Sequence, residues 1–339
     1  MKNENNVLLT GGAGYIGSHT AVVLAEAGYN VTLYDNFSNS RRSVIQSLQT
    51  ITGRGLNLVE GDVRDTASLE RALREHGIEA VIHFAGLKAV GESVEKPVEY
   101  FDNNVVGTVS LLKAMRSAGI RNLVFSSSAT VYGQPDYLPI DESHPTSATN
   151  PYGRTKLHIE ELLADVALSD RSQRILCLRY FNPVGAHESG LIGEDPNDIP
   201  NNLMPYIARV ASGRLPHLNV FGDDYDTADG TGVRDYIHVM DLAEGHLAGL
   251  MQLQRGTGWQ AINLGTGKGF SVLEMVRAFE QACGRPIPYR ITDRRAGDIA
   301  TCYAKADKAW EQLGWRAERT LEEMCNSTWR FTRHAGSGD

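Results

Sequence analysis

A glycine-rich turn close to the start of the sequence constrains the fold more than any other feature. The turn is Gly11-Gly12-Ala13-Gly14-Tyr15-Ile16-Gly17, which follows an apolar run at residues 7–10 and precedes a predicted helix at about residues 18–27. Glycines at this spacing permit a tight turn and let the backbone approach a pyrophosphate, whose charge faces the N-terminus of the helix. The pattern predicts the first βα unit of a dinucleotide-binding fold, with the turn at the cofactor.

The strand–helix alternation continues through the first half of the chain. Further strand-like runs lie at residues 31–35, 56–60, 80–84, 122–126 and 175–179. This alternation predicts an α/β fold, a doubly wound parallel sheet of the Rossmann type. From about Phe181, Gly, Pro and Asn become frequent, which indicates a domain change. We expect a Rossmann domain at residues 1–180 and a smaller C-terminal substrate-binding α/β domain at residues 181–339, with a segment near 235–265 that can return to the Rossmann sheet.

Composition excludes several classes of function. The 339 residues include 41 acidic and 33 basic side chains, a formal net charge of −8, so the basic footprint of a nucleic-acid-binding protein is absent. The four cysteines are far apart and form no Cys-x-x-Cys, which predicts free thiols and no metal site. Neither a signal-peptide core nor an apolar run of membrane-spanning length is found, so we expect a cytoplasmic protein without a membrane partner.

Two carboxylates indicate which dinucleotide binds. Asp35 ends the second predicted strand, 18 residues after Gly17, close to the spacing expected for an acceptor of the adenosine ribose hydroxyls. A carboxylate there repels a 2′-phosphate, which favours NAD over NADP. Asp62 follows the third predicted strand and is expected at the adenine edge. Arg41 and Arg42 could in principle bind a phosphate, but solvated basic residues at a helix start are the simpler interpretation.

Three side chains predict the chemistry. Tyr152 and Lys156 are four residues apart and share one helix face, 24 residues after Ser128, which ends a predicted parallel strand. Ligands bind along the carboxyl edge of such a sheet. A free tyrosine titrates near 10, and both an ammonium group and a positive nicotinamide would favour its phenolate. Ser128 can hydrogen-bond the reacting oxygen. The set predicts hydride transfer with Tyr152 as the base.

The glycine turn, His83-Phe84-Ala85-Gly86, Asn103, Ser128 and Tyr152-x-x-x-Lys156 together resemble the extended short-chain dehydrogenase/reductase family. Within it, the strings at residues 84–93, 126–133, 179–187 and 230–239 are similar to the UDP-glucose 4-epimerases, and the similarity runs through nearly the whole chain. The resemblance implies an isomerase with a tightly bound NAD that is regenerated in each cycle. Hydride leaves C4 of the sugar, the 4-keto sugar turns over, and hydride returns to its other face. A homodimer formed by helices near residues 105–117 and 152–168 is also implied.

The resemblance also implies which residues form the sites. The NAD site would comprise Gly11, Gly14, Tyr15, Ile16, Gly17, Asp35, Asn36, Ser40, Asp62, Val63, Phe84, Ala85, Gly86, Lys88, Asn103, Ser128, Tyr152, Lys156 and Phe181. The UDP-sugar site would comprise Ser128, Tyr152, Asn182, Asn202, Leu203, Phe221, Arg234, Arg295, Asp298 and Cys302. Arg234 and Arg295 supply planar, permanently charged donors that suit a diphosphate, although either arginine alone is more often a surface ion-pair partner.

Cys302 bears on the range of sugars. The resemblance places it at the wall of the sugar pocket, where the family carries either a bulky tyrosine or a small residue. A small side chain leaves room for an N-acetyl group at C2, which predicts activity on UDP-N-acetylglucosamine as well as UDP-glucose. A buried cysteine that packs as a small apolar residue is a compatible interpretation.

Three other functions remain as alternatives. A nucleotide-sugar 4,6-dehydratase needs an acid/base pair beside the catalytic hydroxyl, and Ser128-Ala129-Thr130 contains no carboxylate. A net dehydrogenase would release NADH during turnover. A regulatory protein that binds NAD without catalysis would not need the complete set of Ser128, Tyr152 and Lys156.

Overall fold

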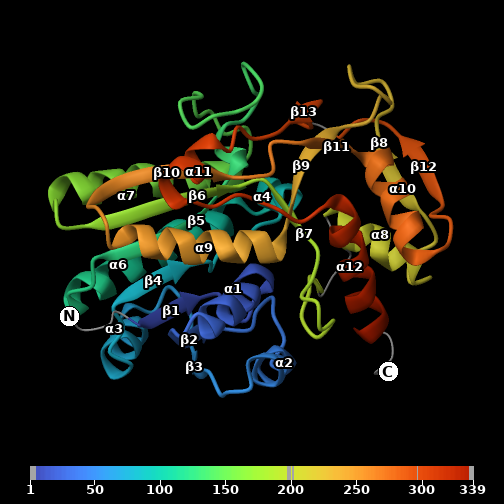
Figure 1. Ribbon diagram of the computed structural model, residues 1–339. Helices are drawn as coiled ribbons and strands as arrows, with labels where there is room; N and C mark the ends of the chain where they lie inside the picture. Colours follow the sequence, from blue (N-terminus) through green and yellow to red (C-terminus); the bar gives the residue numbers. More distant parts are fainter. Residues whose placement is uncertain (1–4, 197–199, 201, 296, 336–339) are drawn as a thin grey trace.

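The computed structural model describes residues 5–196, 200, 202–295 and 297–335, and its centre is a seven-stranded, all-parallel sheet (Figure 1). The strand order is β10-β6-β5-β4-β1-β2-β3. The strands are β1 (Asn6–Thr10), β2 (Asn30–Asp35), β3 (Asn57–Glu60), β4 (Ala80–His83), β5 (Asn122–Ser128), β6 (Arg174–Tyr180) and β10 (Gly258–Leu264). The expected Rossmann fold is confirmed, and the predicted strands agree with the observed ones to within two residues.

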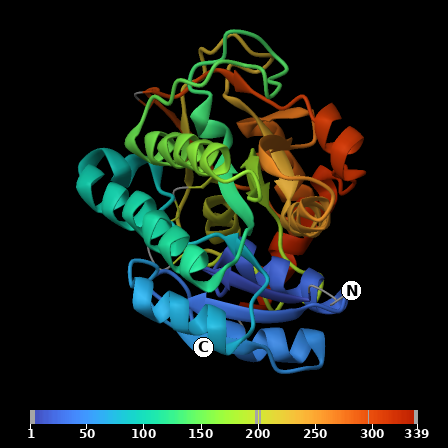
Figure 2. The same ribbon diagram turned by 90° about the vertical axis from the view of Figure 1, so that its left-hand side faces the viewer.

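Helices cover both faces of this sheet (Figure 2). One face carries α1 (Tyr15–Glu26), α2 (Ser43–Thr52), α9 (Val239–Leu253) and α11 (Asp307–Leu313), and the other carries α3 (Thr66–Glu75), α6 (Gly107–Ala118) and α7 (Pro151–Ser169). Successive side chains of a strand point to opposite faces, so Leu8 and Leu9 of β1 enter different cores. Burial on both faces explains why these strands are nearly continuous apolar runs.

The segment before α6 differs from the sequence prediction. The expected helix near residues 105–117 is preceded by α4 (Val90–Glu95), α5 (Pro97–Tyr100) and a π-helix, η1 (Phe101–Val106). Helix α1 likewise begins at Tyr15 rather than at Ser18, because the glycine turn ends sooner than expected. A π-helix has i→i+5 hydrogen bonds and is rare, so a pattern search based on 3.6 residues per turn does not find it.

A smaller α/β region follows β6 and lies to the right of the sheet in Figure 1. Strand β9 (Val233–His238) pairs with β7 (Asn182–Val184), β11 (Gly269–Ser271) and β13 (Thr301–Cys302), while β8 (Leu218–Phe221) pairs with β12 (Tyr289–Thr292). Helices α8 (Leu203–Ala211), α10 (Val272–Cys283) and α12 (Leu321–Ala335) share a third core. Between these elements, α9 and β10 return to the large sheet.

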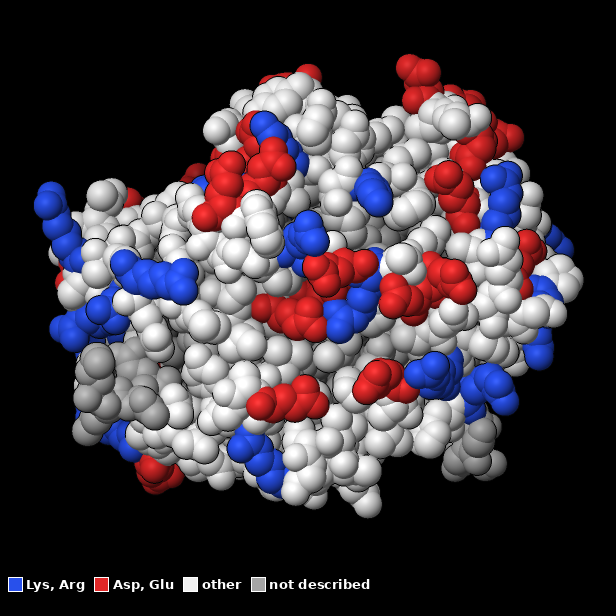
Figure 3. Space-filling model, viewed as in Figure 1, with Lys and Arg blue, Asp and Glu red and all other residues white. Residues whose placement is uncertain are grey.

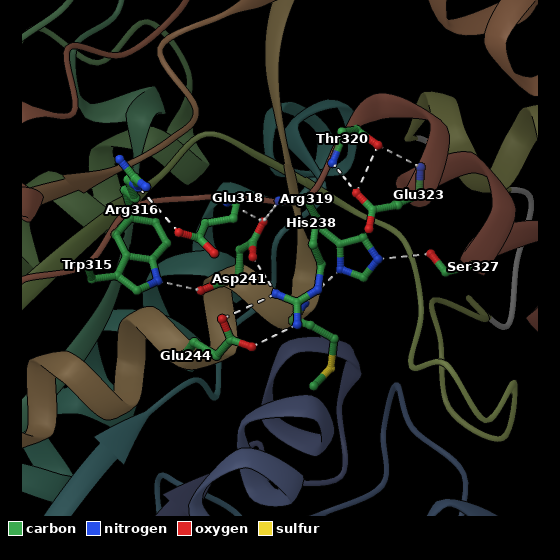
Figure 4. Close-up of polar contacts among 11 residues, drawn as sticks. His238, Asp241, Glu244, Trp315, Arg316, Glu318, Arg319, Thr320, Glu323 and Ser327 are labelled. Atoms are coloured by element: carbon green, nitrogen blue, oxygen red, sulfur yellow. Dashed lines mark hydrogen bonds and ion pairs between the residues drawn. The ribbon is translucent and has the colours of Figure 1, made fainter.

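A buried polar cluster holds the two regions together (Figure 4). Asp241 of α9 is 1% exposed, forms an ion pair with Arg319, and accepts a hydrogen bond from the Arg319 backbone N–H at 2.9 Å. The Trp315 ring N–H donates to the carbonyl of Asp241 at 3.0 Å. His238, at the start of α9, lies 3.0 Å from the Ser327 hydroxyl on α12. These contacts fix α12 and the segment before it against the Rossmann sheet.

Three further observations concern membrane spans, metal sites and surface charge. No described helix has the length and apolarity that a membrane span requires. Within the described ranges, no group of three or more His, Cys, Asp or Glu side chains could hold a metal ion. On the face shown in Figure 3, basic and acidic side chains are interspersed.

Candidate active site

The site begins where the strand order of the sheet reverses. From β1 the chain proceeds outward to β2 and β3, then returns to β4 on the other side of β1. Crevices for ligands form at such a switch point, outside the carboxyl ends of the strands. The glycine turn leaves β1 at this point, and the loop after β4 carries Phe84, Ala85, Gly86 and Lys88.

The glycine turn and the loop after β4 are too close together for side chains. Gly11 has φ +67°, and a Cβ there would lie 2.8 Å from the backbone N of Ala85. A Cβ on Gly17 would lie 2.4 Å from the carbonyl oxygen of Gly11. Tyr15 and Ile16 open α1, and the Tyr15 hydroxyl donates to the carbonyl of Gly185 at 2.7 Å. Bare backbone is therefore presented at the N-terminus of α1, as a pyrophosphate requires.

The residues predicted for the adenosine half gather at the ends of β2 and β3. Asp35 accepts hydrogen bonds from the Ala13 N–H at 2.9 Å and from the Ser40 hydroxyl at 3.0 Å, which joins β2 to the glycine turn. Asp62 lies 3.4 Å from the Asn36 amide nitrogen. Hydrogen bonds from the Arg64 side chain lower the pKa of Asp62 to about 2. Val63, which follows, is buried.

Asn104 links η1 to the loop after β4 and to α7, and the sequence prediction did not name it. The prediction named Asn103, whose amide donates to Asn104 at 2.9 Å in the π-helix η1. The Asn104 side chain accepts from the Leu87 N–H at 2.8 Å and donates to the Leu87 carbonyl at 3.0 Å. It also donates to the Thr155 hydroxyl on α7 at 3.0 Å. The buried Asn104 amide thus joins the loop after β4 to α7. In the sequence, the one signal for this contact is that Asn104 follows the predicted site residue Asn103.

Glu194 was also missed. Its carboxylate forms an ion pair with Lys88 at 2.7 Å and accepts from the Asn202 amide at 2.8 Å. Lys88 was predicted at the cofactor and Asn202 at the substrate, so Glu194 connects the two sets. Phe84 packs beside His246, with ring centroids 4.8 Å apart. No periodicity or motif around Glu194 singles it out.

The three predicted catalytic residues converge at the end of β5. Ser128 is the last residue of β5, and α7 begins with Pro151 after the Asn150 side chain accepts from the Gly153 N–H at 2.8 Å. This cap fixes the start of α7, so Tyr152 and Lys156 lie on one face of its first turns. The Lys156 ammonium nitrogen lies 5.9 Å from the centre of the Tyr152 ring and donates to the Ser126 carbonyl at 2.6 Å.

Electrostatics around these groups are set mainly by burial. Burial raises the pKa of Tyr152, and its hydrogen bond with Ser128 partly offsets that rise. Burial lowers the pKa of Lys156 to about 8, while the carboxylate of Glu160 acts in the opposite direction. The Ser128 oxygen accepts from the Thr130 N–H at 3.2 Å and from the Thr130 hydroxyl at 3.0 Å. Since a hydroxyl oxygen has two lone pairs, the Ser128 proton remains available to donate.

The predicted substrate residues form two groups in the smaller region. The Arg295 guanidinium lies 4.5 Å from the centre of the Phe221 ring and 3.2 Å from a carboxylate oxygen of Asp298. Arg234 on β9 and Cys302 on β13 are paired in register, and Asn182 on β7 pairs with Tyr236 on the same β9. Leu203 opens α8.

Cys302 joins this region to the catalytic one. It is 8% exposed and packs in a small apolar cluster with Tyr132 and Phe181. The same cluster includes Ala129, the neighbour of Ser128. Phe181 follows β6 directly and was predicted at the NAD site. Burial raises the pKa of the Cys302 thiol to about 11.

The structure therefore fits NAD at the switch point. The observation that decides this is the side-chain-free approach of Gly11 to Ala85 at the N-terminus of α1, together with the Asp35 carboxylate at the end of β2. The residues around the glycine turn, Asp35 and the loop after β4 are the ones that the sequence predicts at the cofactor.

Comparisons with known proteins agree with this geometry. A family model described as GDP-mannose 4,6 dehydratase matches residues 8–328. A UDP-glucose 4-epimerase from Bacillus subtilis is 57% identical over 96% of this chain and 96% of its own length. The corresponding human enzyme is 56% identical over 98% of this chain and 97% of its own. A crystal structure of UDP-glucose 4-epimerase from Bifidobacterium longum, in complex with NAD+ and UDP, is 54% identical and superposes with a TM-score of 0.95, covering 98% of this chain and 100% of that one.

The agreement covers both the sequence and the fold. The match covers nearly the whole chain at more than half identity. The sheet reversal presents bare backbone to a dinucleotide, and Ser128, Tyr152 and Lys156 lie at the end of β5 on the same edge of the sheet. This chain belongs to the UDP-glucose 4-epimerases, the NAD-dependent isomerases of the extended short-chain dehydrogenase/reductase family.

Proposed function

We propose that this chain interconverts UDP-glucose and UDP-galactose by inverting C4 of the sugar through a transient 4-keto intermediate. The observation that carries the proposal is the convergence of Ser128, Tyr152 and Lys156 at the end of β5, next to the loop after β4 and on the same edge of the sheet as the glycine turn. Each residue then has a defined task. NAD, when bound, accepts a hydride from C4 and returns it to the opposite face of the same carbon.

The proton follows a path through Tyr152. The Ser128 hydroxyl, whose oxygen already accepts two hydrogen bonds, donates toward the reacting oxygen and orients it. Tyr152 takes the proton from the C4 hydroxyl and returns it when the sugar is reduced on its other face. Lys156, held against the Ser126 carbonyl, supplies the positive charge that favours the phenolate.

The UDP part of the substrate is held by the smaller region. Arg234 and Arg295 bind the diphosphate, Phe221 lines the uridine pocket, and Asp298 accepts from the ribose. The contacts among Phe221, Arg295 and Asp298 support this grouping because they place an aromatic face, a guanidinium and a carboxylate together. Asn182, Asn202 and Leu203 are the remaining substrate contacts. They belong to the smaller region, and the sugar must lie between that region and Tyr152.

The proposal is tested by incubating the purified protein with UDP-galactose without added NAD and separating the epimers. Conversion is expected, together with NAD in the acid extract of the protein. The Tyr152→Phe variant should keep its NAD and lose activity by about 10²–10⁴-fold, the usual contribution of a positioned general base. Full turnover in a Tyr152→Phe variant that still binds NAD would refute the mechanism.

The same assay separates the alternative functions. A net dehydrogenase would stop after one turnover of its bound NAD and would accumulate free NADH, seen by its absorbance, only once NAD is added. A regulatory NAD-binding protein would convert no sugar. A 4,6-dehydratase would release a 4-keto-6-deoxy sugar. Thr130, two residues after Ser128, hydrogen-bonds to the Ser128 oxygen and offers no carboxylate for that elimination.

We also propose that N-acetylated substrates are accepted. Cys302 is small and lies in the apolar cluster beside Phe181, so its replacement by tyrosine would fill space near the sugar. Wild type should epimerise both UDP-N-acetylglucosamine and UDP-glucose. Cys302→Tyr should lose the first activity by at least about tenfold and keep the second, since one bulky group in a pocket changes discrimination by about 1–3 kcal/mol. Unchanged activity on the N-acetyl sugar in Cys302→Tyr would contradict the idea.

A homodimer in the cytoplasm completes the proposal. Exposed apolar side chains line the segment before α6, with Val94 at 64% and Val98 at 76% exposure, and Leu168 at the end of α7 reaches 79%. A second copy of the chain would cover them, which sedimentation of the purified protein checks. The four cysteines are free thiols, three of them buried, as suits a reducing compartment. Cell fractionation tests the location.

A further inference from the structure

A buried ion pair lies directly behind the catalytic lysine. Glu160 follows Lys156 by one helical turn on α7, and the two side chains belong to residues that are 2% and 4% exposed. The Glu160 carboxylate accepts from Arg179 of β6 through Nη2 at 2.6 Å and through Nε at 3.0 Å. A buried pair of this kind is seldom worth more to stability than apolar residues of the same size, so its presence beside a reaction site calls for a chemical reason.

Hydrogen bonds connect the Glu160–Arg179 pair to residues on both sides of Ser128 in the sequence. The Ser127 hydroxyl, one residue before Ser128, donates to Glu160. Arg179 donates to the Tyr132 hydroxyl at 2.9 Å, and Tyr132 directly follows the 3₁₀ turn η2 (Ala129–Val131) that Ser128 caps. Tyr132 in turn donates to the Asn263 side chain on β10 at 2.6 Å. Strands β5 and β6 therefore donate directly to the Glu160 carboxylate of α7, and β10 is linked to it through Tyr132 and Arg179.

The charges of the groups around Lys156 indicate how the Glu160 carboxylate can act on it. The ammonium lies 4.8 Å from the centre of the Phe125 ring, and its hydrogen bond goes to an uncharged carbonyl, that of Ser126. His83 of β4 is buried, and burial lowers its pKa to about 3, so it is neutral. Burial raises the pKa of the Cys177 thiol on β6, so it is neutral too. Tyr152 is the reacting group, and the charge of Arg179 is offset by Glu160.

We propose that Glu160, fixed by Arg179 and Ser127, is a positioning residue of the C4 epimerisation that keeps Lys156 charged beside Tyr152; this inference rests on the proposed function. Glu160 touches neither the sugar nor the reacting atoms. It acts through Lys156, and through Ser127 it also holds the strand end that presents Ser128.

The pH profile of kcat tests the inference on the NAD-containing enzyme with UDP-galactose. Replacing Glu160 with Gln keeps the shape of the side chain but removes the charge and leaves Arg179 unbalanced, and both changes disfavour the Lys156 ammonium. The alkaline limb of the profile, where Lys156 loses its proton, should move to lower pH by about one unit or more. The KM for UDP-galactose should stay within about twofold, because Glu160 does not contact substrate.

A double variant distinguishes the effect of the lost carboxylate charge from an effect of misfolding. Glu160→Gln leaves a buried arginine unpaired, which can destabilise the protein severely. Glu160→Gln with Arg179→Met removes both charges, should restore the melting temperature, and should still show the displaced alkaline limb because Lys156 lacks its carboxylate. A double variant with a wild-type pH profile would overturn the inference.

Asp241 provides the matched control. It is a buried carboxylate in an ion pair with an arginine, Arg319, on the opposite face of the sheet from α7 (Figure 4). Asp241→Asn should lower the melting temperature and leave the alkaline limb in place. If Asp241→Asn moves the limb as far as Glu160→Gln does, the effect is general loosening and the inference is wrong. A wild-type enzyme that converts no UDP-galactose would instead refute the proposed function.

Discussion

At the scale of single residues, Gly17 has less free space than any side chain needs. A Cβ there would lie 2.4 Å from the carbonyl oxygen of Gly11, and this neighbour is backbone that cannot rotate away. Gly17→Ala must therefore shift the first turn of α1 away from the glycine turn. We expect a loss of about 1–3 kcal/mol in unfolding free energy, as for other overpacked sites, and a lower NAD content in the purified protein, measured by chromatography of the acid extract.

Gly91 is the control for this substitution. It lies in α4, and no heavy atom is found within 4 Å of the position its Cβ would take. Gly91→Ala should keep the NAD content and leave stability unchanged or slightly raised, since alanine favours a helix by up to about 1 kcal/mol. A Gly17→Ala protein with the NAD content and melting temperature of wild type would contradict the assigned role of the turn.

Residues whose roles follow from local spacing could be predicted from the sequence, and residues that act through pairing could not. Tyr152 and Lys156 share a helix face because they are four residues apart in the sequence. Ser128 belongs to the Ser-rich end of a segment that is predicted to be a buried strand. Glu160 and Arg179 are 19 residues apart on different elements, so their ion pair depends on how α7 packs on β6. Glu194 meets Lys88 across 106 positions, which no pattern in one sequence records.

At the scale of elements, α7 shows how one helix carries most of the chemistry. Asn150 and Pro151 mark its start in the sequence, and from there Tyr152, Lys156 and Glu160 follow at successive turns of one face. The helix is therefore a predictable feature. Its partner, the π-helix η1, is not, because its hydrogen-bond spacing has no signature in the apolar pattern. Yet η1 places Asn104 against both Leu87 and Thr155. Helix α7 and the loop after β4 are therefore held together by a π-helix that the sequence does not reveal.

At the scale of the whole molecule, buried histidines make stability depend on pH. Burial lowers the pKa of His83 and His238 to about 3 and that of His19 and His246 to about 4. They lie on β4, at the start of α9, in α1 and within α9, so both regions of the molecule are affected. In the unfolded chain an imidazole titrates near 6.5. Between about pH 6.5 and 4 the unfolded chain therefore binds protons that the native protein does not.

The sign of the effect follows from this difference. Stability is fully present above about pH 6.5 and is lost as the pH falls, toward 4 for His19 and His246 and toward 3 for His83 and His238, because protons then favour the unfolded chain. Each of these histidines removes up to about 1.4 kcal/mol of unfolding free energy per pH unit in that window. We expect the melting temperature to change little between pH 7 and 8 and to fall steeply from pH 6.5 to 5, as measured by calorimetry at constant ionic strength.

Two variants identify the groups responsible. His83 lies between the hydroxyls of Thr10 and Thr108, at 2.6 and 2.9 Å, and His83→Asn removes one titrating group while keeping a polar side chain there. This variant should be less stable at every pH but should lose stability with a shallower slope, by about one proton, below pH 6.5. His334, exposed in the last turn of α12, is the control, and His334→Ala should leave the slope unchanged. An equal slope in His83→Asn and wild type would show that acid unfolds the protein through other groups, with carboxylates the first to test, because proton uptake by the imidazole of His83 on unfolding could then not be the cause.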